Sequence, residues 1–134
     1  MRPVLALALL LLAVLPARAD DGADIRAVIG DQLQAFQADD GNRAFGHASP
    51  VLQQKFGDPQ VFMEMVRTGY DPVYRPREVE FQDLEVNGGT FTQKVLFVDR
   101  DGKAWLARYT MERQGDGSWK INGVWLEALP DVST

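Results

Sequence analysis

The sequence contains no cysteine and only one histidine. Without cysteine the chain has no disulfide, no thiol nucleophile and no zinc–thiolate site. It also lacks a phosphate-cradling glycine loop, a dinucleotide fingerprint and a recognisable metal-ligand spacing. We therefore expect neither a metal nor a cofactor.

The single histidine, His47, is the only candidate imidazole base. A catalytic triad would need Ser49 as nucleophile and Asp39 or Asp40 as the carboxylate. Ser49 is better explained as a helix cap before Pro50, and a separation of two residues does not bring the His47 and Ser49 side chains together. Catalysis by His47 is accordingly disfavoured.

Positive charge is scarce as well. The chain has 14 Lys and Arg against 19 Asp and Glu, a formal net charge of −5, and it has no basic run. Phosphate neutralisation supplies most of the affinity for nucleic acid, and basic clusters attract anionic lipid. We expect no nucleic-acid partner.

The one long apolar run, Val4–Leu15, is too short to cross a membrane. It has twelve residues before Pro16, whereas a spanning helix needs about 20. Arg2 precedes it and Ala17-Arg18-Ala19 follows, which is the pattern of a cleavable secretory signal rather than an anchor. We predict a signal peptide over residues 1–19, cleavage after Ala19, one domain over residues 20–134, a periplasmic or secreted location and no membrane association after cleavage.

The first half of that domain has the periodicity of helices. Apolar residues recur at helical spacing from Ile25 to Phe36. A short helix is expected over residues 44–48, and Ser49-Pro50 and Asp58-Pro59 read as two further helix starts. Residues 70–76 contain two prolines and are expected to be extended.

After residue 77 the apolar period changes to two. The expected strands, residues 78–86, 90–99, 103–114 and 118–127, are separated by short glycine-containing turns, which predicts a four-stranded antiparallel meander. The turn lengths pair Gln93 with Tyr109, Tyr109 with Gly123 and Ala107 with Trp125. The opposite sheet face would then carry Leu96, Leu106, Val124 and Leu126, a candidate homodimer surface.

Several short motifs run through the whole domain: Gln34-Ala35-Phe36 with Asp40, Ala44-Phe45 with Ala48-Ser49-Pro50, Met65-Val66 with Gly69-Tyr70 and Pro72-Val73-Tyr74-Arg75-Pro76, Gln93 with Val95, Asp101-Gly102 with Trp105, and Gly117 with Trp119, Ile121 and Gly123. With these motifs the chain resembles the exported domain-of-unknown-function 4864 family, within the nuclear transport factor 2-like superfamily. The resemblance implies an α+β fold in which N-terminal helices pack on a curved four-stranded sheet to form a cone. Val124 stands where the family often has cysteine. The family has no established activity, and the superfamily includes isomerases, cyclases, dehydratases and non-catalytic binding modules.

Seven residues are candidates for contacting a ligand in such a cone: Asp40, Tyr70, Tyr74, Arg75, Gln93, Tyr109 and Trp125. Gln93 and Tyr109 form either a polar pocket floor or an internal hydrogen bond. The two loop tyrosines and Arg75 either meet a ligand or close the core edge, with Arg75 paired to a carboxylate.

Three functions remain open. The first is a non-catalytic module for a small, partly apolar ligand. The second is a homodimerising or interaction protein that uses the outer sheet face. The third is an isomerase or dehydratase with Asp40 or Asp83 as base and Tyr109 as acid, although a bulge could displace Asp83.

Overall fold

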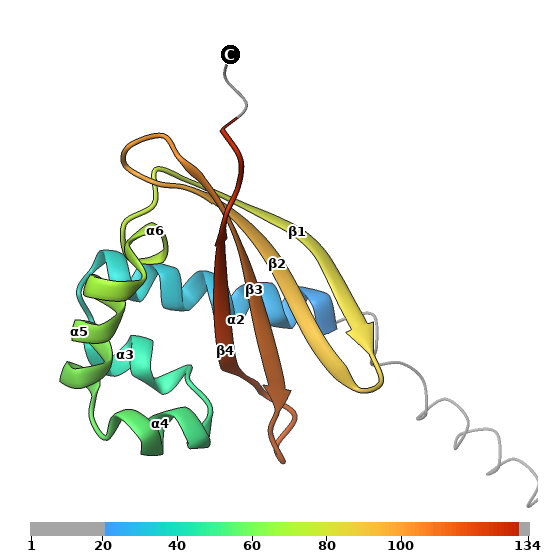
Figure 1. Cartoon of the computed structure of the whole chain (residues 1–134). Helices are drawn as coiled ribbons and strands as arrows, with labels where there is room; N and C mark the ends of the chain where they lie inside the picture. The colour runs from blue at the N-terminus through green and yellow to red at the C-terminus, as the bar shows by residue number, and fades with distance from the viewer. Residues whose placement is uncertain (1–20, 132–134) are drawn as a thin grey trace, which may run out of the picture.

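The computed structural model describes residues 21–131, so the predicted signal peptide lies outside the described residues. Within this range five helices precede four strands (Figure 1). The helices are α2 (Asp21–Gln37), α3 (Gly41–Gly46), α4 (Pro50–Phe56), α5 (Pro59–Gly69) and α6 (Asp71–Tyr74). The strands are β1 (Glu78–Asn87), β2 (Thr90–Val98), β3 (Ala104–Arg113) and β4 (Trp119–Ala128). The predicted α+β class and the antiparallel order β1-β2-β3-β4 are confirmed.

The helix starts follow the predicted caps. The Ser49 side chain accepts a hydrogen bond from the Leu52 amide, and the Asp58 side chain accepts one from the Val61 amide. Pro50 follows Ser49 at the first helical position, where its missing N–H costs nothing. The expectation of an extended segment over residues 70–76 is wrong in part, because α6 makes one helical turn there. Proline is compatible with the first turn of a helix, so Pro72 does not prevent it.

Helix α2 lies across one face of the sheet and supplies much of the core (Figure 1). Ile25, Ile29 and Phe36 from α2 are almost completely buried. They share one apolar cluster with Val95 and Phe97 of β2. The shorter helices α3, α4 and α5 lie beyond the β4 edge of the sheet (Figure 1). None of the helices within residues 21–131 combines the length and apolarity needed to span a membrane.

The register between β2 and β3 is as predicted, with Gln93 opposite Tyr109. The first pairs between β3 and β4, such as Met111 with Ile121, are also confirmed. The register then shifts, because Thr110 pairs with Gly123 while Met111 pairs with Ile121. One extra residue on β4, Asn122, therefore forms a β-bulge.

This bulge corrects two predicted pairs and the faces that follow from them. Tyr109 pairs with Val124 rather than Gly123, and Ala107 pairs with Leu126 rather than Trp125. A shift of one residue moves every later side chain to the opposite face. Val124 and Leu126 therefore pack against the core and leave the predicted homodimer surface, while Trp125 lies opposite Arg108 with 63% of its surface exposed.

Candidate functional site

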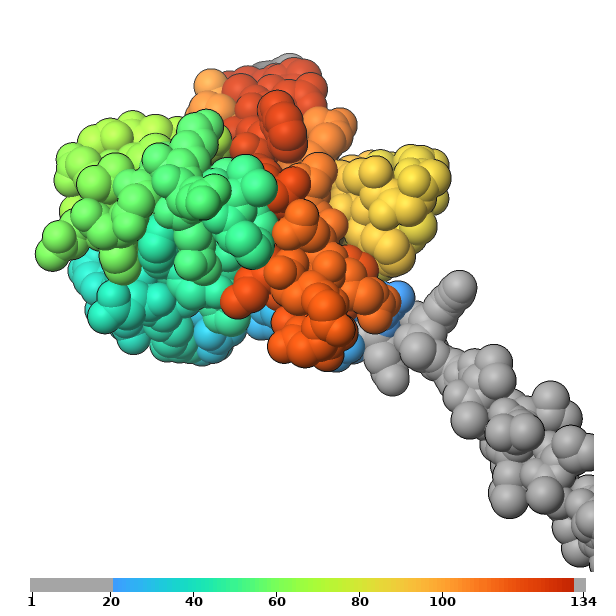
Figure 2. All heavy atoms as spheres, turned by 90° about the horizontal axis from the view of Figure 1, so that it is seen from below, coloured from blue at the N-terminus to red at the C-terminus, as the bar shows by residue number. Residues whose placement is uncertain are grey.

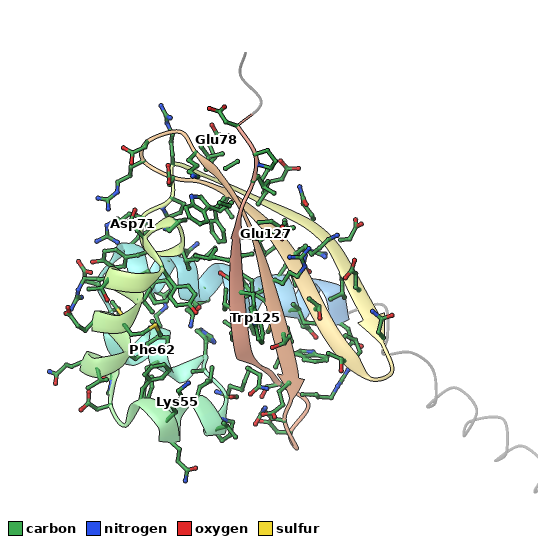
Figure 3. The ribbon with its side chains drawn as sticks, in the orientation of Figure 1. Lys55, Phe62, Asp71, Glu78, Trp125 and Glu127 are labelled. Carbon is green, nitrogen blue, oxygen red and sulfur yellow. The ribbon has the colours of Figure 1, made fainter. Side chains whose placement is uncertain are left out.

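A groove of about 790 Å³ lies between β4 and the helices α4 and α5. Figure 3 shows Phe62 of α5 and Trp125 of β4 on its two sides. Viewed from below, the helical half of the molecule and the end of the sheet lie side by side (Figure 2). One wall of the groove, from α4 and α5, is thus separated in the chain by nearly the whole sheet from the other wall, which is β4.

The lining of the groove is mainly apolar. Leu52 and Phe56 come from α4, Phe62 and Met65 from α5, and Val124 and Leu126 from β4. Met65 and Gly69, four residues apart on α5, both line it, as expected for neighbours on one helix face.

The polar groups of the lining are mostly engaged within the protein. The Gln32 amide donates to the Ala44 carbonyl at 3.1 Å, and the Asn122 side chain accepts from the Ser49 hydroxyl at 2.7 Å. The Tyr70 hydroxyl donates to the Val124 carbonyl at 3.3 Å. Lys55 is the only charged residue in the lining that the structure describes. The groove therefore offers an apolar surface with one cation and no acid–base pair.

Two of the seven predicted ligand residues, Tyr70 and Trp125, line this groove. Trp125 reaches it differently from the prediction, because the β4 bulge places its ring over Gly123 rather than on the inner face. A Cβ at Gly123 would lie 3.0 Å from that ring. A side chain at position 123 would therefore have to displace the Trp125 ring from its place over the strand.

Tyr74 and Arg75 join the end of α2 to α6 instead of lining the groove. Both hydrogen-bond to the Asp39 carboxylate, Arg75 at 3.1 Å. Arg75 also donates to the Phe36 carbonyl at 2.6 Å and lies 4.1 Å from the Tyr74 ring centroid. The Tyr74 hydrogen bond and the nearby Arg75 charge hold the pKa of Asp39 below its usual value. Of the two interpretations left open for this segment, the structure matches the internal ion pair.

Asp40 caps α3, where its side chain accepts a hydrogen bond from the Arg43 amide at 3.2 Å. Its side chain is exposed and is not part of the groove lining. This is the role of an ordinary helix-end residue. Asp83 is exposed as well, in the irregular stretch of β1 between Phe81 and Leu84.

Gln93 holds that irregular stretch of β1 in place. Its buried amide donates to the Gln82 carbonyl at 2.7 Å and to the Lys94 carbonyl at 2.9 Å. Neither Gln93 nor Tyr109 lines the groove, and no hydrogen bond joins the two side chains in the described structure. The β1 bulge leaves carbonyls without ladder partners, and Gln93 supplies one.

Tyr109 lies in the core rather than at a binding surface. Its side chain is 0% exposed, and within residues 21–131 its hydroxyl has no hydrogen-bond partner. Burial raises the pKa of Tyr109 far above its usual value. The phenol is consequently not hydrogen-bonded to either predicted base, Asp40 or Asp83.

Replacing Tyr109 by phenylalanine is expected to preserve or raise the free energy of unfolding, by about 1 kcal/mol, because an unpartnered buried hydroxyl carries a desolvation cost. Tyr70→Phe is the matched control, since its hydroxyl does have a partner, and it is expected to lose about 1 kcal/mol. Urea unfolding of both variants measures the difference. A loss of stability in Tyr109→Phe larger than that in Tyr70→Phe would show that the Tyr109 hydroxyl is hydrogen-bonded in solution.

One cluster of charged residues was not predicted from the sequence. Asp31 of α2 accepts hydrogen bonds from Arg43 at 3.0 Å and pairs with His47 at 2.7 Å. The Arg43 hydrogen bond, followed by that of His47, holds the pKa of Asp31 well below its usual range. The nearby Ser49 hydroxyl is directed to Asn122 instead. The cluster therefore ties α2 to α3, and the triad considered for His47 is not formed.

Together, the fold and the groove define a small α+β protein with helices on one face of an antiparallel meander and an apolar groove at the sheet edge. The family model described as "Domain of unknown function (DUF4864)" matches residues 18–134, and the chain belongs to this family. No curated protein matches it. A 2.5 Å structure from Catenulispora acidiphila is similar in fold, with a TM-score of 0.53 and 16% sequence identity over 83% of this chain and 93% of that chain.

Proposed function

We propose that this protein is an exported, non-catalytic binding module of the nuclear transport factor 2-like kind, and that its groove takes a mainly apolar ligand. The observation that carries this proposal is the groove of about 790 Å³ beside β4. Its volume lies within the range of about 300–1,000 Å³ that ligand pockets occupy. An apolar lining with few polar groups is also typical of such pockets.

The absence of paired acid and base groups from the described lining favours binding over catalysis. An isomerase or dehydratase needs a base within hydrogen-bond reach of the substrate proton. Asp40 caps a helix, Asp83 lies on β1, and Tyr109 is in the core. Export rests on the sequence of residues 1–19, with its apolar run and its Ala17-Arg18-Ala19 site.

The groove is tested by filling it. The probe is 1-anilinonaphthalene-8-sulfonate (ANS), whose apolar rings suit the lining and whose anionic group suits Lys55. Met65→Trp places a larger side chain in the groove and is expected to weaken ANS binding by about tenfold, the effect of losing about 1.4 kcal/mol. Fluorescence titration of the purified protein measures the affinity.

Val61→Trp is the matched control, because Val61 is on the same helix but is 50% exposed and is not in the groove lining. We expect it to leave the ANS affinity unchanged. Equal affinities for the two tryptophan variants would place the ANS site elsewhere and contradict the proposed function.

A further inference from the structure

Strand β4 is an edge strand whose backbone faces the groove. It pairs with β3 on one side only. On the other side the Ile121 amide donates to the His47 carbonyl, and the Ile121 carbonyl accepts from the Ser49 amide, both at 2.8 Å. Beyond Ile121, no strand of the described chain pairs with this side of β4.

The backbone groups on the side of β4 away from β3 belong to alternate residues. The Val124 carbonyl meets the Tyr70 hydroxyl of α5's C-cap, which shows that it points away from β3. The Leu129 amide donates to the Ala104 carbonyl and therefore points toward β3. Because backbone direction alternates along a strand, Leu126 and Ala128 present their N–H and C=O groups on the same free side as Val124.

The protein's own chain already begins a fifth strand at this edge. Ala48 forms a parallel bridge with Ile121. Pro50 then starts α4 and carries the chain away from β4. The edge thus pairs with the short link between α3 and α4 at Ala48 and has no such partner once the chain enters α4.

The surroundings of this edge suit a strand with alternating side chains. Side chains on its inner face would contact Leu52, Phe56 and Met65, which line the groove. Natural edge strands are commonly blunted by lysine or proline. The segment Val124–Ala128 contains neither, and its one charged residue, Glu127, is paired with Arg108 at 2.8 Å.

We propose that the ligand of this groove is an extended peptide segment of another protein, which adds to β4 as a fifth strand. This inference rests on the proposed function, since it names the ligand class of the same groove. Strand addition uses the main chain for affinity and adjacent pockets for alternate side chains, and the β4 edge with its apolar wall provides both. The part of the segment that lies in the groove is uncharged, because the lining is apolar and its one charged residue, Lys55, would repel a cation. The ends of the segment, outside the groove, are neutral or cationic, because the chain carries a net charge of −5.

A second copy of the chain fits this position less well than a single segment. Its own β4 edge lies behind α4 and α5, which form the far wall of the groove. Its other edge strand, β1, carries four carboxylates, at Glu78, Glu80, Asp83 and Glu85. Insertion of the β4 edge would bring the helices of the second copy into the groove. Insertion of the β1 edge would bring four carboxylates into an apolar groove. A single extended peptide segment avoids both.

The test uses the purified protein, labelled with ¹⁵N, and the capped peptide acetyl-Lys-Val-Thr-Val-Thr-Val-Lys-amide. The matched control peptide has the same side chains with its five central amide nitrogens methylated, so that its central residues cannot donate from either edge. We expect the first peptide to slow hydrogen exchange of the Leu126 and Ala128 amides by about tenfold or more, as strand pairing requires. We expect the methylated peptide to bind at least about tenfold more weakly.

The outcomes separate this inference from the proposed function. Equal binding of the two peptides, or no protection of the β4 amides by the first one, overturns strand addition. If ANS still distinguishes Met65→Trp from Val61→Trp, the groove itself remains a binding site; if it does not, the proposed function fails as well. Amide protection that rises with protein concentration alone would identify a second copy as the occupant and would also overturn the inference.

Discussion

Replacing Gln93 by glutamate is expected to lower the free energy of unfolding by about 3–5 kcal/mol at pH 7, the usual effect of an uncompensated buried charge. The Gln93 amide is 0% exposed and donates to the Gln82 and Lys94 carbonyls. A carboxylate there would face two acceptors, and the carbonyl of the β1 bulge would lose its donor. Urea unfolding followed by circular dichroism measures the loss.

The loss in Gln93→Glu should also depend on pH. Burial disfavours the charged form, so the pKa of the new carboxyl is raised in the folded state. The destabilisation therefore begins as the pH rises through the unfolded pKa of about 4.3 and is complete only above the raised folded-state pKa. Below about pH 4.3 the carboxyl is protonated in both states and the penalty is largely lost. Relative to the parent protein, the variant is expected to lose less stability at pH 4 than at pH 7.

Gln82→Glu is the matched control, because it makes the same chemical change in the same bulge with an exposed side chain. We expect its free energy of unfolding to change by no more than about 0.5 kcal/mol. A loss equal to that of Gln93→Glu would mean that added negative charge near the β1 bulge, rather than loss of the buried amide, is responsible.

The elements that the sequence predicted best are those set by local chemistry. Ser49-Pro50 and Asp58-Pro59 act through hydrogen bonds within one helical turn, so a short stretch of sequence specifies the starts of α4 and α5. The β2–β3 register follows likewise from the Arg100-Asp101-Gly102 turn, in which Gly102 has φ of 84°. That backbone conformation favours glycine.

The position of Trp125 was predicted wrongly because a bulge in mid-strand has no turn to mark it. The predicted pairs from the turn up to Met111 with Ile121 are correct, and the error begins at Asn122. Gly123 was a usable signal, since glycine inside a strand often marks a bulge. For β1 the change of apolar parity between Phe81 and Leu84 did indicate a bulge, which the structure confirms.

The groove could not be located from the sequence because no local pattern specifies it. Tyr70 and Trp125 were among the candidates, but their neighbours Met65 and Phe56 appear as ordinary apolar positions of α5 and α4. Whether such a side chain fills the core or lines a groove depends on the distance between α5 and β4. That distance is set by tertiary packing between segments far apart in the chain.

The packing of α5 gives the second large prediction, a loss of about 3–5 kcal/mol in the free energy of unfolding for Phe62→Ala. Phe62 is 5% exposed. Its ring centroid lies 6.1 Å from that of Phe36, 5.3 Å from that of Phe45 and 5.7 Å from that of Phe56. The alanine substitution therefore removes the contacts of this ring with three other aromatic rings, each on a different helix.

Val61→Ala is the matched control for this change, because Val61 precedes Phe62 on α5 and is half exposed. The loss in its free energy of unfolding is expected to stay within about 0.5 kcal/mol.

The comparison of the two variants decides whether the α5 wall of the groove is rigid. The cost of a large-to-small substitution depends on how far the surrounding residues collapse into the space left behind. A loss of free energy of unfolding below about 1 kcal/mol in Phe62→Ala would therefore mean that α5 moves freely toward β4. A wall that moves so easily would close the groove, and a fixed binding site beside β4 requires the larger loss.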